Sequence, residues 1–525
     1  MDIEGLSVEL RNIAGTENVS ADPSHRAIMG TDIFYSRTPP ALVVRPRHAD
    51  ELPAIVAAIA RQGGTIAARG GGLSYSAGYL TDRPDTVLID TGGLTRIVEI
   101  NPQDMYVHVE AGVTWSQLND ALKAKGLRTP YWGTGSGLHA TVGGSASQNA
   151  VNYGSARWGF LADSIAGLKV VLGDGRVLKT GAWATNESPI PFTKHYGPDL
   201  TGLFLADSGA MGVKAEIVLQ LILRPQAVRY AAFSFDRRED FAAAISDVGR
   251  ADVVTECFGF DPWFLSRRVA STGFADDVKK LINVAKHEGS VVKGLKAALN
   301  IAVAGRHHLK NVGYTIHMAM DGRDDDDAER ELAIVRKICS GHAGREIEPS
   351  IPRIMRSTPF PPPIMLLGPD GDRWVPMHGI VAHSRHLPAL EAVDAYMNRH
   401  ANVIEQHGLV WGQVSTLVGR SSVLVEVNLY FRDERPAMVE RYLDRNYLES
   451  RTKYPRAPEV WAAVDKLRNG LSQVFRDLGG IHMQIGRAYP YLDSRLPENR
   501  DLLKSLKAHV DPKGVLNPGA LQLGP

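Results

Sequence analysis

Short apolar segments alternate with polar ones along the first third of the chain, and their spacing predicts both helices and strands. An apolar stripe at helical spacing follows Asp50 and ends at Gly63 and Gly64, which predicts a helix between them. The next four residues, 65–68, are short and apolar, as is typical of a buried strand. The chain therefore passes from a helix into a strand just before its most glycine-rich turn.

Three β-rich runs, TVLIDT, RIVEI and YVHVEAG, come later in this region and are separated by Gly93 and by Asn101. This spacing predicts an antiparallel meander. Thr114 and Gln117 then form a capping box for a helix that Gly126 ends.

The segment RGGGLSYSAG, residues 69–78, lies directly after the predicted strand. Glycine permits positive φ and lets a ligand approach without meeting a Cβ, and successive backbone N–H groups can form an anion-binding concavity. The natural guest of such a loop is a diphosphate. The sequence has no G-x-G-x-x-G opening a helix in a βαβ unit and no G-x-x-x-x-G-K-[ST], so neither a Rossmann unit nor a phosphate loop is predicted.

Composition indicates an ordinary globular protein of two or three domains. The chain has 525 residues, 44% hydrophobic and 22% charged. Its 59 basic and 58 acidic side chains leave a net charge of +1, so no overall field attracts nucleic acid or an anionic membrane. The first residues, MDIEGLSVEL, are acidic where a signal peptide is basic, and no integral membrane segment is expected. We expect a cytoplasmic protein.

Several other features are expected to be structural. Cys257 and Cys339 lie in apolar contexts and are expected to be buried, free thiols. The run DGRDDDDAER, residues 321–330, predicts an acidic helix start, because it lacks the glycine and terminal glutamate of a calcium loop. Residues 280–310 predict a basic amphipathic helix, on the protein surface or, as the alternative, on a membrane.

Four later segments follow the glycine loop in a fixed order. They are GTGSGLHATVGGSASQNAVNYGSARWG (133–159), GLKVVLGDGRVLKTG (167–181), DLTGLFLADSGAMGVKAEIVLQL (199–221) and DPKGVLNPGAL (511–521). Together with RGGGLSYSAG they resemble the vanillyl-alcohol oxidase and p-cresol methylhydroxylase superfamily. The C-terminal features are shared with its D-lactate dehydrogenase and alkyl-dihydroxyacetone-phosphate synthase branches.

The resemblance implies an α+β fold of two domains, a p-cresol methylhydroxylase-type FAD-binding domain and an α+β cap domain over the flavin. It implies an N-terminal helical arm (1–36), the FAD domain (37–225), the cap (226–478) and a C-terminal segment that returns to the FAD domain (479–525). The residues that it places on FAD are Arg69, Gly70, Gly71, Gly72, Leu73, Ser74, Thr134, Gly135, Thr141, Val142, Gly143, Gly144, Ser147, Gly154, Gly209, Gly212, Val213 and Asn517.

The same resemblance bears on how the flavin is attached. Several members link FAD covalently through the histidine of an RGGGH motif, and Leu73 stands at that position here. Other members use a residue of the cap, where Trp411 falls at the position of the linking tyrosine. His378, His383 and His407 stay open as covalent links, but we predict noncovalent FAD.

In the phenol-oxidising branch, tyrosines and an arginine bind a phenolate, and Tyr75 aligns with one of those tyrosines. A purely structural role beside the glycine loop is the alternative for Tyr75. The branch's C-terminal Tyr-Arg pair is replaced by Gln484 and Ile485. Arg487 and Tyr489 lie close by and could restore a cation and a phenol at the flavin, or could be surface residues.

In the D-2-hydroxy-acid branch, a metal-binding H-x-G-D-G-N-x-H motif and a later G-E-H-G-I-G are expected, and neither occurs here. No metal site is predicted. Glu426 and Asn428 lie two residues apart and face the same side of a probable strand. His482 stands where the second motif has its glutamate, and we expect it to be a general base, with a structural histidine as the alternative. His378 is the second choice.

These features predict an FAD-dependent oxidoreductase that takes a hydride from a C–OH or benzylic carbon of a small organic alcohol or phenol, preferably aromatic. Oxygen or another acceptor would receive the electrons, and a homodimer is left open. The alternatives are a D-2-hydroxy-acid dehydrogenase, a non-redox flavoenzyme like alkyl-dihydroxyacetone-phosphate synthase, and a flavin-free binding protein.

Overall fold

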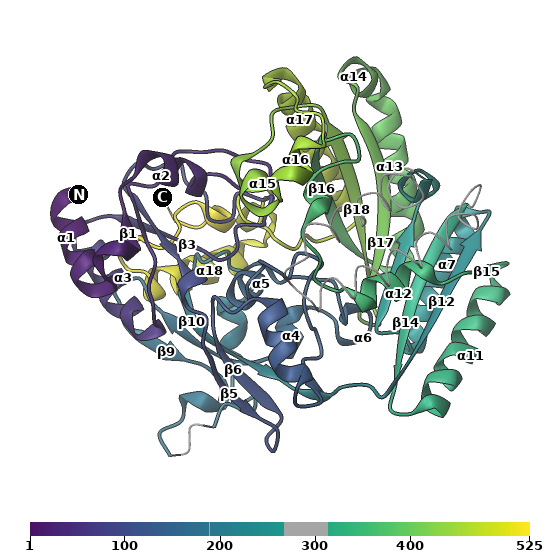
Figure 1. Cartoon of the computed structure of the whole chain (residues 1–525), viewed down its shortest axis with the longest axis horizontal. Helices are drawn as coiled ribbons and strands as arrows, with labels where there is room; N and C mark the ends of the chain where they lie inside the picture. Colours follow the sequence, from purple (N-terminus) through teal and green to yellow (C-terminus); the bar gives the residue numbers. More distant parts are fainter. Residues whose placement is uncertain (188–189, 267–312, 525) are drawn as a thin grey trace.

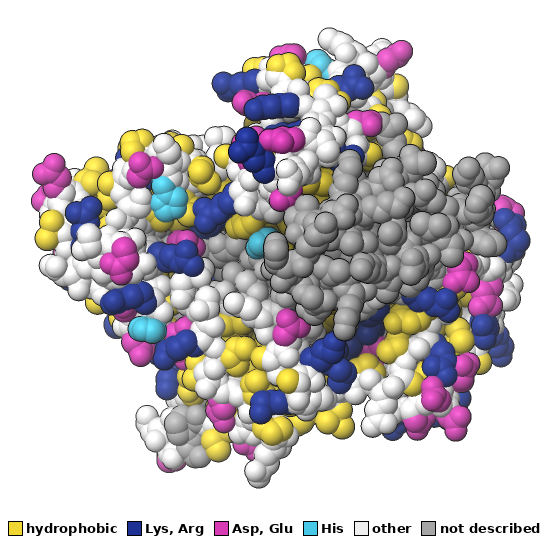
Figure 2. Space-filling view, viewed as in Figure 1, with side chains coloured by type: hydrophobic (Ala, Val, Ile, Leu, Met, Phe, Trp, Pro, Cys, Tyr) yellow, Lys and Arg dark blue, Asp and Glu magenta, His cyan; other side chains and the backbone are white. Residues whose placement is uncertain are grey.

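The computed structural model describes residues 1–187, 190–266 and 313–524 (Figure 1). The helix expected within residues 280–310 lies outside these ranges. Within them, none of the helices is both long and apolar enough to span a bilayer. Lys and Arg side chains are interspersed with Asp and Glu over the described part of the face in Figure 2, as the near-zero net charge leads one to expect.

Two sheets build the N-terminal half. The first has the strand order β1-β2-β4-β3, in which β2 and β3 both run parallel to β4. The second has the order β5-β6-β10-β8-β9 and is antiparallel. Their strands are β1 (Val19–Ser20), β2 (Leu42–Val44), β3 (Thr65–Arg69), β4 (Thr86–Asp90), β5 (Ile97–Asn101), β6 (Tyr106–Glu110), β8 (Ile165–Val171), β9 (Val177–Lys179) and β10 (Val213–Gln220). A two-stranded sheet joins β7 (Leu127–Arg128) to β11 (Ile222–Leu223).

The predicted meander is wrong in one respect. β4 pairs in parallel with β3, whereas β5 and β6 form an antiparallel hairpin in the other sheet. Local spacing does not reveal this, because the crossover that parallel pairing of β3 and β4 requires is the irregular segment 70–85, which contains the glycine loop, while α3 (Leu52–Arg61) connects β2 to β3. The predicted capping box of Thr114 and Gln117 is confirmed at the start of α4 (Trp115–Lys123).

The other helices of this half flank these sheets. They are α1 (Ile3–Ala14), α2 (Pro23–Met29), α5 (Val142–Gln148) and α6 (Ser155–Trp158). The C-terminal segment also returns here, because the N–H of Ile66 in β3 donates to the Val515 carbonyl at 2.7 Å and the Asn517 N–H donates back to Ile66 at 2.7 Å. The C-terminal segment therefore supports the strand that leads into the glycine loop.

The middle of the chain builds one antiparallel sheet of seven strands, in the order β15-β12-β14-β13-β17-β18-β16. The strands are β12 (Ala227–Phe235), β13 (Glu256–Phe260), β14 (Tyr314–Gly322), β15 (Arg345–Ile347), β16 (Arg373–Ala382), β17 (Val410–Val418) and β18 (Ser422–Phe431). The helices packed on this sheet are α7 (Arg238–Ala251), α11 (Asp325–Gly341), α13 (His386–Arg399) and α17 (Pro458–Asp477) (Figure 1). Shorter helices are α8 (Pro262–Phe264), α12 (Ser350–Ser357), α14 (Ala401–Gln406), α15 (Ala437–Tyr442) and α16 (Arg445–Glu449), and α18 (Pro497–Val510) follows in the C-terminal segment.

The acidic run begins α11, as predicted, because the Asp324 side chain accepts a hydrogen bond from the Asp327 N–H. Cys257 and Cys339 are free and buried, also as predicted. The proline-rich stretch near Phe360 is irregular backbone that packs against Trp132 in the first half.

A buried ionic network joins the two halves. Arg356 of α12 donates to Glu256 at 2.7 Å and to Asp321 at 2.8 Å, and Arg128 of β7 pairs with Asp321 at 2.8 Å. Trp132 donates its indole N–H to Glu256 at 3.1 Å. Removing one member would leave a buried charge unpaired, so this network holds the seven-stranded sheet against the N-terminal half.

Candidate active site

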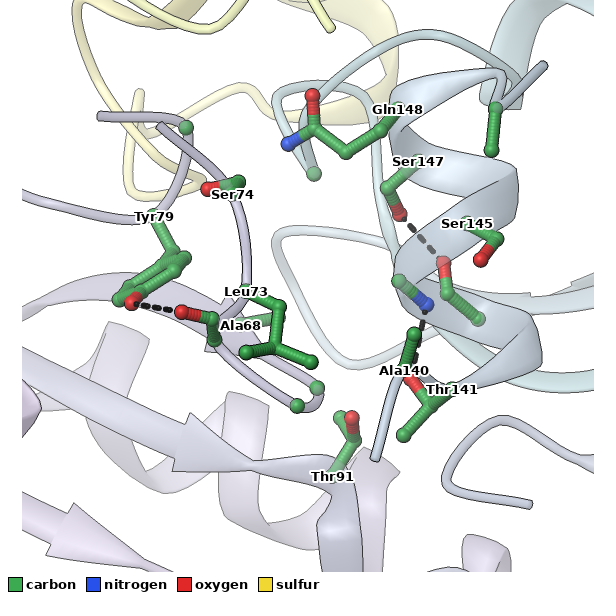
Figure 3. Close-up of a pocket in the computed structure, with 18 of the residues that line it drawn as sticks. Ala68, Leu73, Ser74, Tyr79, Thr91, Ala140, Thr141, Ser145, Ser147 and Gln148 are labelled. Carbon is green, nitrogen blue, oxygen red and sulfur yellow. Dashed lines mark hydrogen bonds between the residues drawn. The ribbon is translucent and has the colours of Figure 1, made fainter. Parts of the chain in front are cut away.

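A cleft of about 880 Å³ opens between the first glycine loop, α5 and the loop before β10 (Figure 3). In Figure 3, Leu73 and Ser74 lie on one side of it, and Ser147 and Gln148 of α5 lie on the other. Its lining is mostly glycine and small hydroxyl side chains, so an extended ligand can approach the backbone on both sides.

The glycine loop lines the cleft with carbonyls that accept hydrogen bonds and N–H groups that have no partner among the described residues. The Tyr442 hydroxyl donates to the Gly71 carbonyl, and the Tyr79 hydroxyl donates to the Gly72 carbonyl at 3.2 Å. Within the described chain, the N–H groups of residues 71–74 have no acceptor. Unpaired N–H groups beside a cleft form an anion-binding nest, which suits a diphosphate.

Two glycines of this loop have no room for a side chain. A Cβ on Gly71 would lie 2.2 Å from the carbonyl oxygen of His139, and a Cβ on Gly70 would lie 2.3 Å from the Thr141 hydroxyl oxygen. Glycine is thus required by the close approach of the segment that precedes α5.

The opposite wall is shaped by small hydroxyl residues and one ion pair. Thr141 caps α5 by accepting from the Gly144 N–H at 3.1 Å, and Ser147 donates to the Gly143 carbonyl at 3.0 Å. Before β10, Asp207 accepts from the Gly209 N–H at 3.0 Å and from Lys214 at 2.6 Å. Lys214 lines the cleft, and its charge is balanced by that of Asp207.

The structure brings most of the expected cofactor residues to this cleft and leaves some behind it. Those that line it are Gly70, Gly71, Gly72, Leu73, Ser74, Thr134, Thr141, Gly143, Gly144, Ser147, Gly209 and Gly212. Those that do not are Arg69, Gly135, Val142, Gly154, Val213 and Asn517. Lining residues that sequence reasoning missed include Tyr79, Gln148, Ser208, Lys214 and Gln484.

Arg69 and Asn517 support the loops from behind. The Arg69 guanidinium donates to the carbonyls of Gly70 and Gly71 at 3.3 and 3.4 Å. The Asn517 amide donates to the carbonyls of Gly78 and Ser208, at 2.7 and 2.6 Å. Asn517 therefore joins the first loop to the loop before β10.

Beyond Gln484, three of the expected catalytic side chains lie together. The rings of Tyr75 and His378 are 6.0 Å apart, and the rings of His378 and Tyr489 are 5.6 Å apart. Neither ring nitrogen of His378 has a hydrogen-bond partner among the described residues, and neither does the Tyr489 hydroxyl. Burial lowers the pKa of His378 to about 3 and raises the pKa of both tyrosines, so all three are neutral at pH 7.

His482 lies behind this group with both ring nitrogens in use. Its Nδ1 donates to the His378 carbonyl at 2.7 Å, and its Nε2 accepts from the Ser472 hydroxyl at 3.1 Å. Its ring stacks on Tyr489 at 4.2 Å. Burial lowers its pKa to about 4. The geometry therefore favours the structural alternative for His482, because neither nitrogen is free to take a proton from a substrate.

Arg487 is also engaged with the backbone. Its guanidinium donates to the carbonyls of Ala77 and Gly78 at 3.1 and 3.3 Å, and to Asn517 and Pro518 at 2.8 and 2.7 Å. No described carboxylate forms an ion pair with it. Arg487 thus connects the glycine loop to the C-terminal segment, rather than facing a substrate.

Two charged side chains that were not expected at the site lie close to Tyr75. Arg468 of α17 is buried, donates to the Tyr75 carbonyl at 3.1 Å and lies 4.4 Å over the ring of Phe34. Glu426 of β18 is directly opposite His378 of β16 in the sheet register. Burial raises the pKa of Glu426 to about 7, and its charge is the strongest one acting on Tyr75.

Two segments that build the half of the molecule around the cleft match known protein families. Residues 40–181 match the family described as "FAD binding domain", and residues 486–521 match "FAD linked oxidases, C-terminal domain". The unpaired N–H groups of the glycine loop and the glycine-only approaches fit the diphosphate of that cofactor. FAD as the cofactor is confirmed.

Curated relatives share part of the chain. A mitochondrial D-lactate dehydrogenase (cytochrome) of Saccharomyces cerevisiae is 25% identical over 351 residues, which are 64% of this chain and 57% of that protein. The glycolate oxidase subunit GlcD of Bacillus subtilis is 25% identical over 262 residues, 50% of this chain and 54% of that protein. The chain thus matches somewhat more than half the length of these two relatives.

Solved structures agree over nearly the whole fold. A p-cresol methylhydroxylase with substrate bound has a TM-score of 0.74 at 17% identity, covering 99% of this chain and 97% of that one. An alkyldihydroxyacetonephosphate synthase has a TM-score of 0.66 at 16% identity, covering 98% and 84%. The predicted fold class and the resemblance to this superfamily are confirmed.

Proposed function

This chain carries the FAD binding domain and the C-terminal domain of FAD linked oxidases, and we propose that it oxidises a C–OH or benzylic carbon of a small organic alcohol or phenol. The observation that carries the proposal is the buried cluster of Tyr75, His378 and Tyr489 beyond Gln484, a residue of the cofactor cleft, because His378 and Tyr489 have polar atoms without a partner among the described residues. Buried polar groups normally have partners, and a substrate would supply them.

FAD would bind with its diphosphate at the N–H groups of residues 71–74 and beside Lys214. When bound, the flavin accepts a hydride from the substrate carbon. With Leu73 at the position of the linking histidine, we propose that the cofactor is noncovalent. A denaturing gel on which flavin fluorescence stays with the protein band would contradict this.

The protein's own residues would bind and orient the substrate. Tyr75 and Trp374, whose rings are 5.9 Å apart, would offer apolar surface to an aromatic or alkyl group, and the Tyr75 hydroxyl would donate a hydrogen bond to the substrate oxygen. His378, kept neutral by burial, and Tyr489 can form hydrogen bonds to a hydroxyl group without adding charge. These contacts support an uncharged alcohol or phenol as the substrate.

A D-2-hydroxy acid is the second candidate, because the curated relatives are named as D-lactate dehydrogenase and glycolate oxidase. The histidine motif that this branch uses is missing from the sequence. The carboxyl group of Glu426 in the pocket would also repel a carboxylate substrate once it is ionised.

The deciding experiment is anaerobic bleaching of the bound flavin. Purified holoenzyme is mixed with benzylic alcohols, alkylphenols, D-lactate, glycolate and 2-hydroxyglutarate, and flavin absorbance is followed. We expect the alcohols or phenols to bleach it. Bleaching by the hydroxy acids alone would establish the second candidate, and a flavin that no compound reduces would overturn both.

Tyr75→Phe tests the pocket itself, with Tyr106→Phe as its control. Tyr106 is buried on β6, and its hydroxyl donates to Glu99 instead. We expect Tyr75→Phe to raise KM by about tenfold through a lost hydrogen bond, and the control to behave as wild type. Equal KM values for Tyr75→Phe and wild type would remove Tyr75 from the substrate pocket.

A further inference from the structure

We propose that the Glu426 carboxylate accepts the proton of the substrate hydroxyl, with His378 as its partner across the strand pair. This inference rests on the proposed function and names the residue that removes the proton. Three observations support it: the sheet register, the absence of an ion pair at Glu426 among the described residues, and the groups around its side chain.

The register places the two side chains on one face of the sheet. β16 and β18 are antiparallel, and His378 pairs with Glu426 while Pro376 pairs with Asn428. Side chains directly opposite one another have Cβ atoms about 4.5–5.5 Å apart, close enough for a hydrogen bond between a long carboxylate and an imidazole. The same face carries Trp374, whose indole N–H donates to Asn428 at 2.6 Å. That bond fixes Asn428 beside Glu426.

Glu426 is half-buried and has no structural ion pair. No described arginine, lysine or histidine lies within salt-bridge distance of it, although buried carboxylates in the cap, such as Glu256 and Asp321, each have an arginine. A carboxyl that lies among buried aromatic side chains without an ion pair is a candidate for chemistry.

The neighbouring groups keep this carboxyl ready to take up a proton near neutral pH. Tyr75 faces it from the glycine loop, His378 from β16 and Tyr489 from the C-terminal segment, and all three are neutral at pH 7. Arg468 of α17 is the cation that acts on Tyr75 and Tyr489, and it donates hydrogen bonds to the Tyr35 hydroxyl and to the Tyr75 carbonyl. Burial raises the Glu426 pKa to about 7, which is close to the value that favours a general base.

The step balances with the proposed reaction. The substrate carbon loses its hydrogen as hydride, which the oxidised cofactor takes. The O–H bond breaks, its electron pair becomes the second C–O bond of the carbonyl product, and the proton goes to a carboxylate oxygen of Glu426. A neutral His378 can donate one N–H to the carboxylate and hold it in orientation. After product leaves, the proton passes to solvent.

Glu426→Gln tests the proposal, with Glu405→Gln, an exposed glutamate of α14, as the matched control. We expect Glu426→Gln to keep FAD but to slow flavin reduction by about a hundredfold or more, and to lose the change in rate around pH 7. An unchanged rate and pH profile, in an enzyme whose wild type is reduced by alcohols, would overturn this inference alone. A wild type that no alcohol reduces would instead overturn the proposed function.

Infrared titration gives a second readout that does not depend on turnover. In the wild type, the carbonyl stretch of a protonated carboxyl should appear as the pH falls through about 7. This band should be missing in Glu426→Gln and present in the control. If Glu426→Gln does not fold, Glu426→Asp replaces it, and its band should shift. A band that is the same in all variants would overturn the proposal.

Discussion

The Asp32 carboxylate accepts a hydrogen bond from the backbone N–H of Ala77 at 2.8 Å, inside the glycine loop. Its other oxygen accepts from the N–H groups of Phe34 and Tyr35 at 2.8 and 2.6 Å. Ala77 has a φ of +52°, a conformation that an alanine adopts only under constraint. The N-terminal arm thus fixes the far end of the loop whose near end binds the cofactor.

Asp32→Asn should weaken FAD binding. An asparagine has only one acceptor oxygen, so its NH2 group would face either Ala77 or the Phe34 and Tyr35 N–H groups. Loss of a charge-assisted bond costs about 1.5–3 kcal/mol, which corresponds to roughly a tenfold or greater rise in the Kd for FAD. Flavin fluorescence titration of the apoprotein measures it. Asp50→Asn, at an exposed ion pair with Lys169, should leave the Kd unchanged.

Gly71→Ala and Gly135→Ala make a matched pair among the glycines that were expected at the cofactor. A Cβ at Gly71 would meet the His139 carbonyl oxygen at 2.2 Å, so the loop or the segment before α5 must move. A Cβ at Gly135 would meet nothing within 4 Å. We expect Gly71→Ala to purify without flavin and Gly135→Ala to retain it, as judged by the visible spectrum. Equal flavin content in both variants would show that the close approach is not needed.

Local sequence predicted the cofactor loop well, because positions that accept only glycine can be recognised in the sequence itself. The close approach at Gly71 can be met by no other residue type. The parallel pairing of β3 with β4 could not be predicted, since it depends on β2 and on the C-terminal Val515, which contacts Ile66 from the other end of the chain. The periodicity of apolar residues shows which face of a strand is buried, but not which other strand it pairs with.

The substrate pocket was predicted only in part for the same reason. Tyr75 and Arg468 are 393 residues apart in sequence and meet through one backbone carbonyl. Nothing in the sequence around Arg468 of α17 or Glu426 of β18 indicates that these charged side chains lie below the surface. Glu426 becomes notable only when the register places it opposite His378.

Arg487→Lys should destabilise the protein without changing the pH dependence of flavin reduction. Its guanidinium donates to four acceptors in two segments, and a lysine ammonium cannot reach them in the same geometry. We expect a loss of about 3 kcal/mol in the free energy of unfolding and weaker FAD binding.

Arg495→Lys, where the guanidinium contacts only its neighbour Ser494 and the ring of Tyr491, is the control for Arg487→Lys. Urea unfolding of the apoproteins compares the two. A changed pH profile of flavin reduction in Arg487→Lys, at unchanged stability, would instead assign Arg487 to the chemistry.

Buried histidines should make part of the stability depend on pH, and His386 is one that has no part in the proposed active site. It is fully buried on α13, where its Nε2 lies 2.9 Å from the Ser415 hydroxyl, and burial lowers its pKa from 6.5 to about 4. His386 is therefore protonated below about pH 6.5 in the unfolded chain, but only below about pH 4 in the folded chain. The stabilisation that neutral His386 provides is complete above pH 6.5 and is lost as the pH falls toward 4.

The size of this effect is on the order of 3 kcal/mol, since each unit of pKa difference corresponds to about 1.4 kcal/mol. His386→Gln should be less stable than wild type at pH 8, because it fits the packed site less well. The difference in the free energy of unfolding between wild type and His386→Gln should shrink between pH 6.5 and 4, because the wild type loses stability on protonation of His386 and glutamine takes up no proton. Urea unfolding at several pH values tests this, with His509→Gln on the exposed side of α18 as the control. A deficit that stays constant with pH would mean that His386 is not held neutral by its burial.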